Sequence, residues 1–212
     1  MIRTAAASAL ALCLVAAPAL AHPHVWVTAR AAVIFDAAGK VTALRHEWTF
    51  DELYSAFQTQ GVATKDGVAT AEELAPLAKL QMDNLKAFGF FTFPKADGQA
   101  AEFAAPRDES LVQTPDRLVT LRFTLPLAAP ASAGKAFAFQ VYDPSYFVDF
   151  KFAGESAVTL EGAPRGCSVG VVAPPPLAGE DLKTRDESFF TGLAPGANFG
   201  AKLASRAVVA CP

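Results

Sequence analysis

Two histidines separated by one proline, His22-Pro23-His24, follow a segment that has the features of an export signal. If a peptidase removes residues 1–21, the new α-amine lies within three residues of two imidazoles. An α-amine has a pKa of about 7.7–8 and an imidazole one of about 6.5, so few protons must leave for a metal ion to bind near neutral pH. The sequence therefore predicts a divalent transition-metal site whose affinity falls on acidification.

Nitrogen donors restrict the choice of metal ion. Copper, nickel, cobalt and zinc bind such ligands, whereas calcium and magnesium prefer oxygen. The donors do not choose among the first four, because affinity generally peaks at copper whatever the physiological ion. Pro23 has no amide proton to lose, which excludes the square-planar site that a third-position histidine often forms. The amine and side chain of His22 can instead chelate one ion, with His24 or a carboxylate completing the set.

The carboxylates nearest to this terminus are expected on Asp51 and Glu52. Apolar residues alternate with polar ones on both sides of a turn-like segment at 36–40, which predicts a β-hairpin. That pairing places His24 across from residue 52 or 53. The predicted metal ligands are therefore His22, His24, Asp51 and Glu52.

The third histidine, His46, is expected far from this site. The same pairing puts it opposite Ala31, roughly 20 Å along the strand from His24 at about 3.3 Å per residue, and on the apolar face. We interpret it as a hydrogen-bonded core residue. A copper oxidative enzyme would need a second, remote histidine ligand, and Ser145 lacks the elbow motif of a hydrolase nucleophile, so we expect no enzymatic activity.

Two functions stay open for the His-Pro-His segment. In the first, the protein is a metal-binding accessory protein that passes its ion to a membrane transporter or ABC permease. In the second, the segment is an incidental polar terminus, and the chain is a structural or protein-interaction module of the cell envelope with aromatic strands as a docking edge.

The first 21 residues indicate a cleaved signal peptide, with Arg3 near the start, an apolar run over 5–17 and an Ala-x-Ala site before His22. This apolar run is too short to span a bilayer. Residues 22–212 are therefore expected to form one periplasmic domain without an integral membrane segment. A formal charge of −3 argues against nucleic acid as a partner.

Cys167 and Cys211 are the thiols that stay after processing removes Cys13. In an oxidising compartment they favour one disulfide that fastens the C-terminus. The alternative, a dithiol metal or redox site, lacks the close spacing that such sites usually show.

Two helices are predicted after the hairpin. Asp51 is the expected N-cap of a short helix that ends at Gly61, with Leu53, Tyr54 and Phe57 on one side. Thr70 and Glu73 form a capping box for the second helix, whose apolar stripe comprises Leu74, Leu77, Gln81, Leu85 and Phe88.

The segment 62–73 has the glycine and final glutamate of a calcium loop. Val62, Thr64 and Ala69 replace ligand positions, so we expect a capped turn and no calcium.

Strands are expected at 90–93, 118–125, 136–141, 146–152, 158–160 and 208–211, separated by turn residues. A proline-rich excursion over the surface is expected from 174 to 198. The pattern predicts an α+β fold, an antiparallel β-sandwich or half-barrel with a two-helix insertion after the first hairpin.

The segment from Tyr142 to Phe147, with an Asp-Pro turn between tyrosines, favours aromatic packing. A functional role would require Asp143 or Tyr146 to lie at the same sheet end as the N-terminus.

Several motifs together resemble a bacterial family of unknown function across essentially the whole mature chain. They are His22-Pro23-His24-Val25, Arg45 to Glu52, Ser55-Ala56-Phe57, the loop around Asp66-Gly67 leading to Leu74, Tyr142 to Phe147, and Gly166-Cys167 with Cys211. Members are commonly labelled the periplasmic component of an uncharacterised ABC-type transport system, and the family is associated with nickel, cobalt and zinc transport genes. The resemblance thus implies metal handling, while Val62 and Thr64 depart from the acidic loop that members often carry.

Overall fold

The computed structural model describes residues 23–62, 64, 67–176 and 198–212. Its strands are β1 (Val25–Phe35), β2 (Val41–Phe50), β3 (Thr92–Ala96), β4 (Gln99–Ala100), β5 (Arg107–Gln113), β6 (Val119–Ala131), β7 (Phe137–Val141), β8 (Val148–Phe152), β9 (Val158–Glu161), β10 (Ser168–Val172) and β11 (Arg206–Ala210). Its helical segments are α1 (Glu52–Gln58), α2 (Ala71–Leu85), η1 (Lys86–Phe91), η2 (Glu155–Ala157) and α4 (Phe199–Leu203).

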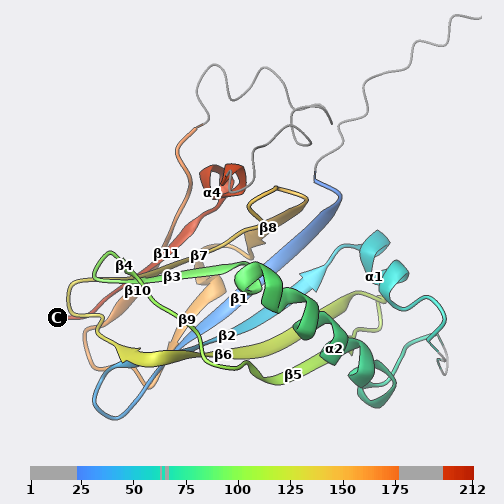
Figure 1. Ribbon diagram of the computed structural model, residues 1–212, viewed down its shortest axis with the longest axis horizontal. Coiled ribbons are helices and arrows are strands. Elements are labelled where there is room, and N and C mark those ends of the chain that lie inside the picture. Colours follow the sequence, from blue (N-terminus) through green and yellow to red (C-terminus); the bar gives the residue numbers. More distant parts are fainter. Residues whose placement is uncertain (1–22, 63, 65–66, 177–197) are drawn as a thin grey trace, which may run out of the picture.

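These strands form two open sheets. The large sheet has the order β5-β6-β2-β1-β8, with β9 also on β1, and the small sheet has the order β10-β11-β7-β3-β4. The small sheet covers part of one face of the large sheet, and α2 lies across another part of it (Figure 1). The predicted α+β sandwich with two helices after the first hairpin is confirmed.

The first hairpin has the register that the alternation predicted. Ala31 lies opposite His46, and Gly39 takes a φ of 73° in the turn. A positive φ is a conformation in which glycine avoids the strain of a side chain. One face of β1, from Val25 to Val33, is buried, because every second residue is apolar.

Two later strands pair with β1 in parallel, which the sequence did not indicate. β8 lies along the first half of β1, with Val25 opposite Val148, and β9 lies along the second half, with Ala31 opposite Val158. Parallel neighbours need a long connection, and here 112 residues separate the end of β1 from the start of β8. This pairing brings the loop before β8 to the end of the sheet where the chain enters β1.

The short helix α1 begins after Asp51 as predicted but ends at Gln58, before the expected Gly61, and only Tyr54 of its expected apolar side packs against the core. Asp51 is its N-cap, while Leu53 and Phe57 are 76% and 68% exposed. The buried side carries Ser55, whose hydroxyl donates to the Phe50 carbonyl and accepts the Val119 N–H at 3.0 Å. The expected apolar side of this helix is therefore wrong at Leu53 and Phe57, because the hydrogen-bonded hydroxyl of Ser55 connects the helix to β6.

The predicted capping box of α2 is present, and its apolar stripe is rotated from the expected one. The Glu73 carboxylate accepts the Thr70 N–H at 2.7 Å, and the Thr70 hydroxyl accepts the Glu73 N–H at 3.3 Å. The buried residues are Leu74, Ala78 and Met82, an i, i+4, i+8 row, whereas Leu77, Gln81 and Leu85 are half-buried. Phe88, expected at the end of the stripe, is exposed because it lies beyond the helix.

The remaining strands agree with the prediction in most places. The strand expected at 90–93 begins only at Thr92, because Phe90 and Phe91 have φ values of 54° and 46°. β5 and β10 were not predicted, since β5 is rich in charged residues and β10 is short and glycine-containing. Most of the expected excursion from 174 to 198 lies outside the described residues.

Cys167 and Cys211 form the predicted disulfide, which joins the start of β10 to the end of β11. No helix within the described part of the chain has both the length and the apolar character needed to cross a bilayer.

Candidate functional site at the N-terminal end of strand β1

His24 lies on the surface, immediately before β1, and its main chain is held by the loop before β8. The N–H groups of His24 and Val25 both donate to the Phe147 carbonyl, at 2.9 and 3.3 Å. The His24 ring also lies against the Phe147 ring, with 4.7 Å between the centroids. The position of this histidine is therefore set by the long-range pairing of β1 with β8.

Asp51 is brought to the same end of the sheet, where both carboxylate oxygens accept main-chain bonds. Oδ1 accepts the Tyr54 N–H and Oδ2 accepts the Trp26 N–H, each at 2.9 Å. The Asp51 N–H in turn donates to the Trp26 carbonyl at 3.0 Å. Asp51 therefore has a structural role, since it caps α1 and binds the main chain of β1. Any bond to a metal ion would use the remaining lone pairs of its carboxylate.

Glu52, the first residue of α1, follows directly and is exposed. The β1–β2 ladder ends with Val27 opposite Phe50 and continues through the Asp51–Trp26 bonds, so His24 and Glu52 lie just beyond its end. Glu52 itself lines a hollow with Thr59 and Arg117, so the proximity of its carboxylate to the His24 ring stays a prediction. His22 lies outside the described residues. Within those residues, no three His, Cys, Asp or Glu side chains form a group that could hold a metal ion.

The loop before β8 owes its shape to Asp143, whose carboxylate is buried. Oδ1 accepts the N–H and the hydroxyl of Ser145 at 2.9 and 2.8 Å, and Oδ2 accepts the Val148 N–H at 3.1 Å. Burying this carboxylate is tolerated because three donors satisfy it. Asp143 thus fixes the loop that presents the Phe147 carbonyl to His24.

Helix α4 packs against the other side of this loop. A Cβ atom on Gly200 would lie only 1.9 Å from the Asp143 carbonyl oxygen, and the Gly200 N–H donates to the Pro144 carbonyl at 3.3 Å. Tyr146 meets Phe199 edge to face at 6.1 Å between centroids. The expected aromatic packing of 142–147 is present, and the loop also lies at the sheet end of the N-terminus. Sequence reasoning missed how Asp143 acts, although Asp-Pro-Ser is a known turn signal.

Large apolar side chains surround this end of the sheet. Trp26 and Phe147 are 48% and 45% exposed, and Leu53 and Phe57 of α1 are exposed as well. Burial, together with the negative charge of Asp51, raises the pKa of Tyr54 above its ordinary value. The phenol therefore stays neutral at physiological pH, and this end of the molecule combines apolar surface with imidazole and carboxylate groups.

His46 lies away from this site, as predicted, and is fully buried among aromatic rings. It stacks on Phe123 at 5.0 Å between centroids and meets the edges of Trp48 and Phe139. No described group hydrogen-bonds either ring nitrogen, so the predicted hydrogen bond is wrong. The physical reason is that only apolar and aromatic surface reaches this part of the core. Burial lowers the pKa of His46 from 6.5 to about 3, so the ring is neutral.

The segment 62–73 is described only in part, since residues 63, 65 and 66 lie outside the described residues. Its terminal carboxylate, on Glu73, belongs to the capping box of α2. The capped-turn interpretation of Thr70 and Glu73 is therefore confirmed.

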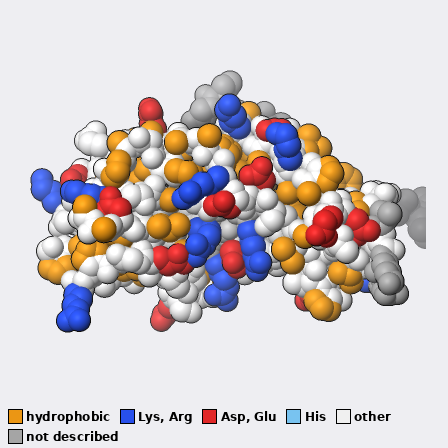
Figure 2. Space-filling view, turned by 90° about the horizontal axis from the view of Figure 1, so that it is seen from below, with side chains coloured by type: hydrophobic (Ala, Val, Ile, Leu, Met, Phe, Trp, Pro, Cys, Tyr) orange, Lys and Arg blue, Asp and Glu red, His pale blue; other side chains and the backbone are white. Residues whose placement is uncertain are grey.

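Charges of both signs mix on the outer surface. On the side that Figure 2 shows, Lys and Arg lie among Asp and Glu without forming a continuous basic patch. Ion pairs join Arg45 with Glu161, and Arg122 with Glu47 at 3.4 Å.

Comparison with known proteins supports the resemblance at the level of the family. The family described as "Protein of unknown function (DUF1007)" matches residues 7–211. The chain belongs to this family. An uncharacterized protein of Haemophilus influenzae is 26% identical over 158 residues, which cover 73% of this chain and 74% of that protein. An uncharacterized 15.5 kDa protein in the trpE 3′ region of Spirochaeta aurantia is 32% identical over 108 residues, covering 50% and 76% of the two chains.

Proposed function

We propose that this member of the DUF1007 family is a periplasmic accessory protein that binds a divalent transition metal at its processed N-terminus and delivers it to a membrane transporter or ABC permease. His22 and His24 supply the nitrogen donors, with Glu52 or a free lone pair of Asp51 as an oxygen donor. Copper, nickel, cobalt and zinc fit this donor set.

The observation that carries the proposal is the fixed position of His24. Its main chain is bound to the Phe147 carbonyl while its side chain lies at the surface, beyond a sheet end that also presents Asp51 and Glu52. An open site of this kind exchanges its ion readily, which a carrier requires. The link to transport rests on the family association.

The decisive experiment is titration of the processed protein with copper, nickel and zinc, after intact mass has established that the chain begins at His22. We expect His22→Ala and His24→Ala each to weaken binding at least tenfold. Adding one alanine before His22 keeps both imidazoles but moves the amine, and it should weaken binding similarly. Lys79→Ala, a surface change on α2, is the control. Unchanged affinity in the His22→Ala, His24→Ala double variant would overturn the proposal.

A second function, an envelope protein-interaction module without metal, draws support from the exposed Trp26, Leu53, Phe57 and Phe147. Exposed apolar patches often mark interaction sites. It predicts that Trp26→Ser lowers affinity for an envelope partner captured by cross-linking, while the histidine variants leave it unchanged. Metal titration and partner capture thus separate the two functions.

A further inference from the structure

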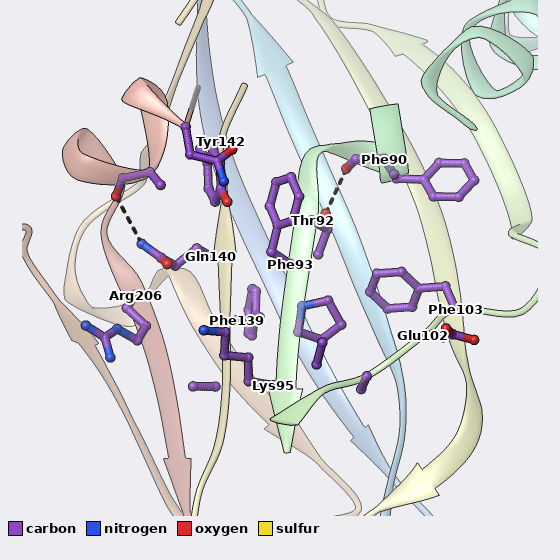
Figure 3. Close-up of a pocket in the computed structure, with 17 residues that line it drawn as sticks. Phe90, Thr92, Phe93, Lys95, Glu102, Phe103, Phe139, Gln140, Tyr142 and Arg206 are labelled. Carbon is purple, nitrogen blue, oxygen red and sulfur yellow. Dashed lines mark hydrogen bonds between the residues drawn. The ribbon is translucent and has the colours of Figure 1, made fainter. Parts of the chain in front are cut away.

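A second candidate site lies on the outer face of the small sheet, away from the residues of the proposed metal site. A hollow of about 730 Å³ runs across β3, β7 and β11 (Figure 3). This volume is within the range of small-molecule pockets. Alanines on its walls leave the space open; they are Ala100, Ala101, Ala138 and Ala201.

The floor of this groove is aromatic. Phe93 of β3 stacks on Tyr142, which follows β7, with 4.1 Å between centroids and 20° between the ring planes. Because the stacked rings cover one face of each other and Tyr142 is buried, the half-buried Phe93 offers the aromatic surface against which a planar group packs. Phe103 adds a third ring on the opposite wall (Figure 3).

One end of the groove is basic. Strand register places Phe93, Gln140 and Arg206 in one row across β3, β7 and β11, and Lys95 in the next row. Two strand spacings, about 10 Å, therefore separate the backbone at the aromatic ring from that at the guanidinium. Among the residues that the structure describes, neither Lys95 nor Arg206 forms an ion pair. Glu102 lies at the other end of the groove from Arg206 (Figure 3).

Gln140 is already committed to structure at this end. Its side-chain amide donates to the carbonyls of Ala201 and Ala204, at 3.4 and 3.1 Å, and so holds α4 over the edge of the groove. Lys95 and Arg206 therefore project from paired strands on either side of β7, whose contact with α4 is held by hydrogen bonds.

We propose that this groove binds a small aromatic carboxylate, with the ring against Phe93 and the carboxylate between Arg206 and Lys95. The guanidinium fork matches the two oxygens of a carboxylate, and the lysine adds a second positive charge. The proposal does not rest on the proposed metal site, because the groove residues and the N-terminal histidines are different side chains.

The test uses phenylacetate as the probe, with phenylacetamide and acetate as comparators that lack the charge and the ring. In an NMR titration we expect saturable shifts of the Phe93, Gln140 and Arg206 amides with phenylacetate, and at least tenfold weaker binding of both comparators. The Lys95→Gln, Arg206→Gln double variant should weaken phenylacetate binding at least tenfold. Ala138→Leu, which fills the hollow, should abolish it, and Lys151→Gln, an exposed cation on the large sheet, should not change it.

Three results would overturn the proposal: no saturable binding of phenylacetate, equal affinity for acetate, or undiminished binding in the double variant. The Lys95→Gln, Arg206→Gln double variant changes only exposed side chains and should fold. Its phenylacetate affinity therefore tests the proposal even if Ala138→Leu does not fold.

Discussion

At the scale of single residues, the most consequential polar group in the core is His46. Its ring is completely buried, and no described protein group satisfies its nitrogens. A buried polar group without a partner costs about 1–3 kcal/mol. The ring fills space in an aromatic cluster with Trp48 and Phe123, and its unsatisfied nitrogens lower the stability of the folded protein.

His46→Leu is expected to raise the free energy of unfolding at pH 7 by about 1–3 kcal/mol, because it removes the buried nitrogens and keeps an apolar filling. Urea unfolding measures the change, with His24→Gln as the control for an exposed histidine. A loss of stability in His46→Leu would show instead that the ring nitrogens are satisfied.

The same residue predicts a dependence of stability on pH. Its pKa is about 3 in the folded protein against 6.5 for a free imidazole, so the unfolded chain takes up a proton that the folded chain does not. Stability should therefore fall as the pH falls from 6.5 towards 3, by about 1.4 kcal/mol per pH unit from this group. The unfolding free energy of His46→Leu, measured over that range, should show a slope shallower by this amount.

Asp51 allows structural and ligand roles to be separated. Asp51→Ala removes the N-cap of α1 and the acceptor for Trp26, and should lower the free energy of unfolding by about 1–2 kcal/mol. Glu52→Ala changes an exposed neighbour and should stay within about 0.5 kcal/mol. Equal stability of the two variants in urea would contradict the structural role of Asp51.

At the scale of elements, the loop before β8 contacts segments near both termini of the chain. It holds the Phe147 carbonyl against His24, and α4 rests on its other side through Gly200. The proposed metal site therefore depends on a C-terminal helix that the sequence places far away.

Gly200→Ala tests this dependence. The new Cβ would lie 1.9 Å from the Asp143 carbonyl, so α4 or the loop must move. We expect a loss of about 1–3 kcal/mol, as for other overpacked sites, together with faster hydrogen exchange of the His24 and Val25 amides. Gly170→Ala, where nothing lies near the added Cβ, is the matched control and should be nearly neutral. Unchanged exchange rates in Gly200→Ala would show that the loop is held without α4.

At the scale of the whole molecule, the disulfide closes a span of 44 residues between Cys167 and Cys211. For a loop of this length the chain-entropy model gives a stabilisation on the order of 4 kcal/mol. Replacing both cysteines by serine should lower the free energy of unfolding by that amount in urea. A reductant should produce the same loss in the parent and none in the variant; a parent insensitive to reduction would contradict the prediction.

The elements that were predicted correctly are formed by interactions between residues close together in the sequence. The N-cap at Asp51, the capping box of Thr70 and Glu73 and the register of the first hairpin all follow from short spacings and a local turn. The pairing of Cys167 with Cys211 was predicted on the expectation that processing removes Cys13.

For the candidate site, the sequence alone predicted the hairpin register that brings Asp51 to the end of β1 where His24 lies, since a local turn connects the two strands. Only the tertiary structure decided that β8 pairs with β1, that Asp143 and Gly200 support the loop beside His24, that Ser55 rather than Leu53 faces the core, and that His46 has no hydrogen-bond partner. The reason is physical. Local hydrogen bonds and alternation are determined by residues a few positions apart, whereas parallel pairing and the surroundings of a buried side chain depend on segments that meet only when the whole chain has folded.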